Sequence, residues 1–176
     1  ASVSASDVTK LVESAVKDKA SVITLDVKGA DKADKVTVTL PKSSVSDITS
    51  KTDASLKVTT PAGYVTLDKK AMKAAVSEAA GSDIKIVIEK QNLTETQKKQ
   101  LGENAAMTGV KVLSGDKEIT NFGSGKLTIA LPVPEKLKDK SLAATIDENG
   151  KLTKYSGKLV TIDNKAYYQF EATKTA

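Results

Sequence analysis

Hydrophobic residues recur along the chain at two spacings, and each spacing predicts a different kind of element. Apolar positions at helical spacing, together with capping residues, predict helices over residues 7–19, 44–50, 68–80 and 94–102. Alternation of apolar and polar residues predicts half-buried strands. These strands cover residues 23–27, 36–40, 56–60, 64–67, 84–88, 110–113, 118–122, 127–131, 142–146, 151–155, 159–162 and 166–172. The pattern therefore predicts an α+β chain, mainly β, with three or four short helices.

Residues with special backbone preferences mark the ends of these elements. Ser6 is placed to cap the first helix, and Gly81 to end the helix before residue 84. Pro41 closes a strand because it cannot donate a ladder hydrogen bond. Asn149-Gly150, between two alternating segments, is the strongest hairpin signal in the chain.

Two parts of the chain resemble each other. Val65–Ala71 matches Val160–Ala166 at five of seven positions, and Val36–Pro41 resembles Leu127–Pro132 in the same order. Similar composition of β-strands is the alternative explanation. We interpret the matches as a duplication, with a first unit over residues 1–90 and a second over residues 68–176. The units share the helix at 68–80, and the second contains an insertion of about residues 91–121. Burying both apolar faces together predicts β-sandwich-like sheets in one compact or two-lobed module.

The composition then excludes several kinds of chemistry. The chain has no His, Cys, Trp or Arg, and all 27 basic residues are Lys. Without His there is no side chain that ordinarily exchanges protons near neutrality, which excludes His-based nucleophilic catalysis. Without His or Cys, the usual zinc, haem and iron-sulfur sites cannot form. Catalysis by two carboxylates, or by Ser with Lys, is the alternative that this composition leaves open, but neither has a recognisable motif here. We therefore expect no catalytic residues, no metal site and no cofactor.

The charge distribution argues against nucleic acid as a partner. The net charge is +5, but 22 acidic residues are interspersed among the lysines and only 3% of residues are aromatic. The chain thus has neither a basic stripe nor a stacking platform for bases. No apolar run approaches the ~18 residues that a membrane span needs. The chain begins at Ala1 without a leader, which we interpret as a mature or excised fragment from which any signal has been removed.

The candidate ligand-binding residues are three tyrosines. Strand alternation places Tyr168 and Phe170 on one face of the last strand and Tyr167 on the other, so we expect the first two in the core. Sugar-binding proteins stack sugar rings on exposed aromatic side chains, which leaves Tyr167, Tyr155 and Tyr64 as candidates. A purely structural role for these tyrosines is the simpler interpretation.

Two acidic clusters are candidate calcium sites. Asp147-Glu148-Asn149 is more simply explained as a hairpin turn, and residues 31–34 lack the ligand spacing of a calcium loop. A Lys-to-Asn or Lys-to-Asp isopeptide bond is a further hypothesis. An intact mass equal to that calculated from the sequence would exclude such a bond.

Several segments together resemble a known family. They are residues 36–41, 63–68, 92–94 with Gln97, 122–132 and 148–152. The resemblance is to the non-catalytic module found upstream of S-layer homology repeats in surface proteins of Gram-positive Firmicutes. The chain departs from that pattern by ending in residues 172–176 without the usual His-Phe-Ser run, and it contains no S-layer homology repeat.

This resemblance implies a location and a general role. We expect a secreted, non-catalytic structural or assembly module of a bacterial cell-surface protein of S-layer type. Its partners would be other modules of the same protein or neighbouring surface proteins. The alternative is a module that binds cell-wall or plant polysaccharide, or a protein, in a surface or cellulosome-type protein.

Overall fold

The computed structural model describes residues 4–28, 35–79, 81, 83–91, 94–101, 107–133, 144–148, 151–155, 157–162 and 164–172. The helices in this part of the chain are α1 (Ala5–Asp18), α2 (Lys42–Lys51), α3 (Lys69–Glu78) and α4 (Glu95–Leu101). The strands are β1 (Val22–Asp26), β2 (Lys35–Pro41), β3 (Ser55–Thr60), β4 (Gly63–Leu67), β5 (Asp83–Gln91), β6 (Met107–Ser114), β7 (Lys117–Ile119), β8 (Leu127–Pro132), β9 (Ala144–Glu148), β10 (Lys151–Tyr155), β11 (Gly157–Ile162) and β12 (Lys165–Ala172).

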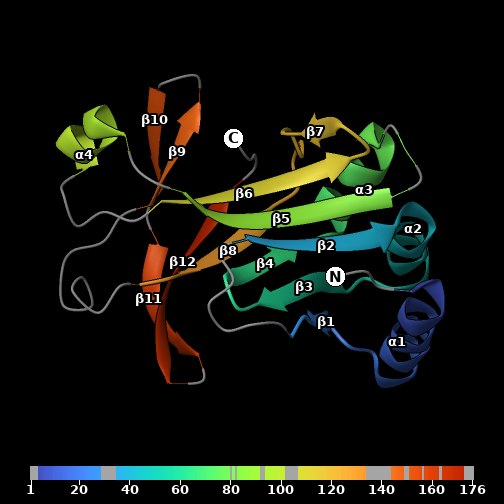
Figure 1. Cartoon of the computed structure of the whole chain (residues 1–176). Coiled ribbons are helices and arrows are strands. Elements are labelled where there is room, and N and C mark those ends of the chain that lie inside the picture. Colours follow the sequence, from blue (N-terminus) through green and yellow to red (C-terminus); the bar gives the residue numbers. More distant parts are fainter. Residues whose placement is uncertain are drawn as a thin grey trace.

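The described strands form two larger sheets and one separate hairpin (Figure 1). The six-stranded sheet has the order β1-β3-β4-β8-β12-β11, and the four-stranded sheet has the order β2-β5-β6-β7. Only the β1–β3 pair is parallel, and all other neighbours are antiparallel. β9 and β10 pair with each other as the hairpin predicted around Asn149-Gly150.

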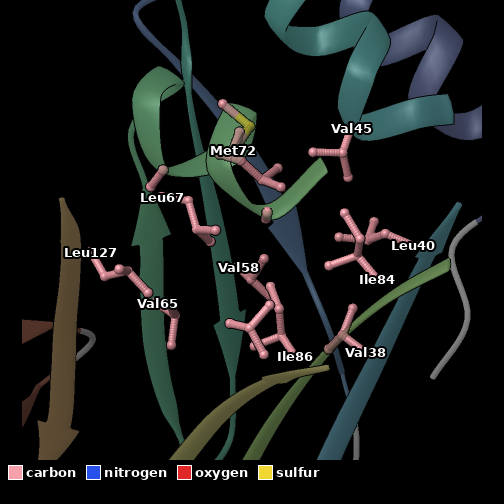
Figure 2. Close-up of a cluster of buried hydrophobic side chains, with 14 of the residues drawn as sticks. Val38, Leu40, Val45, Val58, Val65, Leu67, Met72, Ile84, Ile86 and Leu127 are labelled. Atoms are coloured by element: carbon pink, nitrogen blue, oxygen red, sulfur yellow. The ribbon is translucent and has the colours of Figure 1, made fainter. Parts of the chain in front are cut away.

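One hydrophobic core joins the two larger sheets and the first three helices. Figure 2 shows Val38 and Leu40 of β2 and Ile84 and Ile86 of β5 on one side of this core, with β3, β4 and β8 on the other. Val58 and Val65 are fully buried there. The alternation predicted which face of each of these strands is buried, since the outward positions between the buried residues are mostly Thr and Lys.

Helices α2 and α3 close one end of the core. Val45 of α2 and Met72 of α3 point into it, and both are almost fully buried (Figure 2). Asp68 caps α3, because its Oδ1 accepts a hydrogen bond of 2.8 Å from the backbone N–H of Ala71. Helix α1 packs beside α2 and buries Val8 and Val12 in the same core.

Close packing next to α3 requires a glycine at position 125. A Cβ on Gly125 would lie 2.5 Å from the Cα of Ala71, which no real Cβ contact allows. Two hydrogen bonds hold the loop there, from Asp68 N to Lys126 O at 3.1 Å and from Gly125 N to Phe122 O at 2.9 Å. The loop between β7 and β8 is thus fixed to the start of α3.

The prediction of a mixed, mainly β chain with three or four helices is confirmed, and two facing sheets are compatible with the sandwich-like expectation. Several boundaries differ by a few residues, among them the end of α3, which is Glu78 and not the residue before Gly81. Two of the differences have a clear cause. The N-cap of α1 is Ser4, whose Oγ accepts from Asp7 N at 3.2 Å, because the helix starts earlier than its apolar stripe. The strand expected over residues 118–122 ends at Ile119, and Phe122 is buried in the loop that follows.

The predicted repeat units are not separate lobes in this arrangement. The matched segments 36–41 and 127–132 lie in different sheets, as β2 and β8. The expected insertion supplies α4, β6 and β7, and β6 pairs with β5 along seven residues. Each larger sheet therefore contains strands from both units. The duplication itself stays a prediction.

Candidate functional site

The outer face of the six-stranded sheet carries the aromatic and polar side chains that could bind a ligand. Strand register places Lys57, Thr66 and Thr128 side by side in one row across β3, β4 and β8. The next row contains Tyr64 and Ala130, with Gln169 of β12 beside them. Residues that are paired across strands point to the same face, so these side chains share one surface opposite the core.

A pocket of about 260 Å³ opens on this face. It is lined by Val22, Lys57, Tyr64, Thr66, Thr128, Ala130, Ile162 and Gln169. Val22 lies on β1 and Ile162 on β11, the two opposite edges of the sheet. In a flat sheet these edges would be about 24 Å apart, from five steps of ~4.8 Å. The sheet must therefore curl strongly, so that its outer face is concave.

Two stacked tyrosines form the floor beside this pocket. The ring centroids of Tyr64 and Tyr167 are 5.1 Å apart, with 30° between the ring planes. The smaller Ala130 lies between their strands, on β8, and is only 3% exposed. Tyr167 is itself only 6% exposed, so its ring contacts Tyr64 but does not face solvent. The pocket is in contact with Tyr64 alone of the two.

Lys57 brings a positive charge to the same place. Its Nζ lies 5.4 Å from the centroid of the Tyr64 ring, within range of a cation–π contact. Among the described residues that line the pocket, Lys57 carries the only charge. Two carboxylates lie in the same cross-strand rows, Glu171 opposite Thr128 and Asp26 opposite Thr59, and Glu171 is paired with Lys126 at 3.7 Å. Within the described lining itself, Lys57 is the charge that a bound group would meet, which favours a negatively charged one.

The polar groups of the pocket have unused hydrogen-bonding capacity. Thr66, Thr128 and Gln169 are half-buried, and their side chains make no hydrogen bond to another described residue. Half-buried hydroxyl and amide groups need partners, which here must be water or a ligand. The hydroxyls and the amide can both donate and accept.

The structure brings together two of the three predicted tyrosines. Tyr64 and Tyr167 are in contact, whereas Tyr155 lies in β10, in the separate hairpin, and its side chain is outside the described ones. Phe170 is in the core as predicted, and Tyr168 packs against the core while its hydroxyl accepts a 2.7 Å bond from Gly157 N.

Lys57, Thr66 and Gln169 were not predicted as site residues. Alternation already placed Gln169 on the face of Tyr167, but a single sequence does not reveal which strands become neighbours. The neighbours Lys57 and Thr66 could have been predicted from the hairpin that joins β3 and β4, because its register places these two residues opposite each other.

Other candidate sites gain no support in the described part of the chain. No group of three or more Asp or Glu side chains that could hold a metal ion occurs among the described residues. Residues 31–34 and Asn149 lie outside them, while Asp147 and Glu148 belong to β9. No helix in the searched residues is long and apolar enough to cross a membrane.

Comparison with known proteins returned no relative. No family model, curated protein or solved structure matches this chain.

Proposed function

We propose that this chain is a non-catalytic module of a secreted bacterial cell-surface protein, and that it binds an acidic carbohydrate in the outer-face pocket. The observation that supports the proposal most directly is the convergence of Lys57, Thr66, Thr128 and Gln169 around Tyr64. The surface location comes from the family resemblance of the sequence. Of the two roles open to such a module, structural or ligand-binding, the pocket favours binding.

The chemistry of the pocket matches a sugar better than an apolar ligand. A sugar presents many hydroxyl groups, each both donor and acceptor, and the Thr hydroxyls and Gln169 amide are complementary to them. The apolar side chains of Val22 and Ile162 can cover the C–H faces of a sugar ring. The charge of Lys57, with no carboxylate among the described lining residues, favours a sugar that carries a carboxylate or phosphate.

The size of the pocket sets an expectation for affinity. Its volume of about 260 Å³ is small, below the ~300–1,000 Å³ typical of pockets for drug-sized ligands. We therefore expect it to hold one sugar unit of a longer chain, with weak binding per site. Several copies on a cell surface would raise the avidity without new contacts.

The test is a glycan array probed with the full chain, containing uronate-bearing, phosphorylated and neutral oligosaccharides. Retention of acidic glycans over neutral ones of equal length supports the proposal. The matched variant Gln169→Leu removes a hydrogen-bonding group without changing the charge and should weaken that retention. No retention of any acidic glycan would contradict the proposal.

The second candidate is a structural or assembly role, in which copies of this chain would form part of an S-layer-like lattice. It is favoured by β11, an edge strand that exposes Leu159. Assembly of the full chain into oligomers larger than a dimer, in the absence of any glycan, is the measurement that supports this role, and a chain that never exceeds a dimer would oppose it.

A further inference from the structure

Strand β11 forms an edge of the six-stranded sheet that is available for pairing. Among the described strands it is hydrogen-bonded only to β12, over all six of its residues. Such an edge exposes backbone N–H and C=O groups that can pair with another strand. One of these groups is already engaged at the start of β11, where the N–H of Gly157 donates to the hydroxyl of Tyr168 at 2.7 Å. Leu159, in the middle of β11, is 47% exposed, which makes it one of three large hydrophobic side chains with high exposure among the described residues.

The direction of the free backbone groups follows from one hydrogen bond on the other side of β12. The N–H of Val133 donates to the C=O of Ala166 at 3.0 Å, so the backbone of Ala166 points toward β8. Backbone direction alternates along an antiparallel strand. The backbone N–H and C=O of Tyr168, two residues later, therefore also point away from β11. Its partner Leu159 must then direct its N–H and C=O to the free edge, as does Thr161 opposite Ala166.

We propose that β11 pairs antiparallel with β11 of a second copy of this chain, with Leu159 opposite Leu159 of that copy. The pair would exchange two backbone hydrogen bonds, because both residues direct their N–H and C=O outward. A two-fold axis perpendicular to the sheet then continues the six-stranded sheet into the second copy. Both exposed leucines lie on the same face and cover each other.

The side chains of β11 favour this register. With Leu159 on the axis, Lys158 lies opposite Val160 of the second copy and Gly157 lies opposite Thr161. Shifting the partner by two residues in one direction would place Lys158 opposite Lys158, and like charges directly opposite are destabilising. The shift in the other direction separates the two leucines. The strand thus complements itself best in one register, which is why we assign a second copy as its partner.

The pairing has a consequence for the pocket but does not depend on saccharide binding. The axis is perpendicular to the sheet, so the concave outer faces of both copies point the same way. Ile162 lines the pocket and belongs to β11, so each pocket lies next to the junction. A dimer would present two pockets to one glycan-bearing surface, which increases avidity.

Sedimentation equilibrium of the full chain, over a range of concentrations and at physiological salt, tests the association. We expect a reversible dimer, and we expect Leu159→Lys to shift the dissociation constant by at least about tenfold, since it buries two charges in place of two apolar contacts. Val16→Lys on α1 is the matched control, because Val16 is 53% exposed and α1 lies on the opposite side of the molecule from β11 (Figure 1). Thermal unfolding of each variant confirms that it folds.

Single cysteines test the register, and the absence of native cysteine makes the experiment clean. Leu159→Cys should form an intermolecular disulfide under mild oxidation, because Cα atoms in a hydrogen-bonded antiparallel pair are ~5.5 Å apart. Lys158→Cys should not, since the two copies of that residue would be diagonal neighbours at ~7–8 Å.

A monomeric wild-type chain, equal effects of Leu159→Lys and Val16→Lys, or cross-linking at 158 but not at 159 would each overturn the proposal. Glycan binding by the monomeric Leu159→Lys variant reports on the pocket separately.

Discussion

The ring of Tyr64 lies against the ring of Tyr167, with their centroids 5.1 Å apart, although the two strands that carry them are separated by β8. The contact spans β8 because Ala130 between them is small. It fixes the position of Tyr64 beside Lys57 and thereby shapes the pocket. A residue buried outside the main core thus supports the candidate binding surface.

Removing the ring of Tyr167 should destabilise the fold and deform the pocket. Tyr167→Ala deletes a buried aromatic side chain, and such deletions typically cost ~3–5 kcal/mol. Tyr167→Phe keeps the ring and should cost less than about 1.5 kcal/mol. Urea unfolding of both variants measures the difference. Equal stability of the Ala and Phe variants would show that the stacked ring contributes little.

Substitution of Gly125 should be costly despite the small size of alanine. A Cβ at this position meets the backbone of Ala71 in α3, which cannot move aside as a flexible side chain can. We expect Gly125→Ala to lower the free energy of unfolding by at least ~1–3 kcal/mol, as overpacking does elsewhere. The neighbouring and exposed Ser124 provides the control as Ser124→Ala. If the two variants unfold at the same denaturant concentration, the close approach is not as tight as described.

Ser114 joins the end of β6 to the segment that precedes β5. Its hydroxyl is fully buried, accepts a bond of 2.9 Å from Gly81 N and donates one of 2.9 Å to Asp83 O. Ser114→Ala leaves both backbone groups without this partner, which should cost ~1–3 kcal/mol. Amide exchange gives a local readout, since the Gly81 N–H should exchange faster in the variant. Unchanged exchange at Gly81 would count against this role of Ser114.

The ion pair between Asp53 and Lys69 should make a small, pH-dependent contribution to stability. Lys69 Nζ donates to Asp53 Oδ1 at 2.6 Å, and this hydrogen bond and charge lower the pKa of Asp53 below its ordinary value of 3.8. A lowered folded-state pKa means that the contribution is present above the unfolded-state pKa and is lost as the pH falls through the folded-state pKa.

Thermal unfolding of the wild type and Asp53→Asn checks this expectation. The melting temperature of the variant should be slightly lower near neutral pH, and the two should converge well below pH 3.8. The effect should be small because the Asp53 side chain is 95% exposed. A difference that grows as the pH falls would contradict the assignment.

Local structure was largely predictable, and long-range pairing was not. Alternation located the described strands to within a few residues, because most of those in the larger sheets bury every second side chain, as Val38 and Leu40 in β2 illustrate. Ser4 and Ser6 are both suitable caps, so the start of α1 depended on which hydroxyl reaches Asp7 N.

The candidate site was predicted only in part for the same reason. Tyr64 and Tyr167 are 103 positions apart in the sequence, and their contact depends on β8 lying between β4 and β12. Hydrophobic periodicity assigns each residue a face but does not give the order of strands in the sheet. The sequence therefore could not assign Lys57 and Gln169 to the site, because their proximity depends on the order of strands in the sheet.

Binding of an acidic oligosaccharide by wild type and Lys57→Met, measured by isothermal titration calorimetry, tests the central claim most directly. Hydrogen bonds to charged groups contribute ~1.5–3 kcal/mol, so Lys57→Met should weaken binding by about tenfold or more. Lys111→Met, which makes the same charge change on β6 in the other sheet, should leave the affinity unchanged. No binding by the wild type, or equal loss in both variants, would contradict the account.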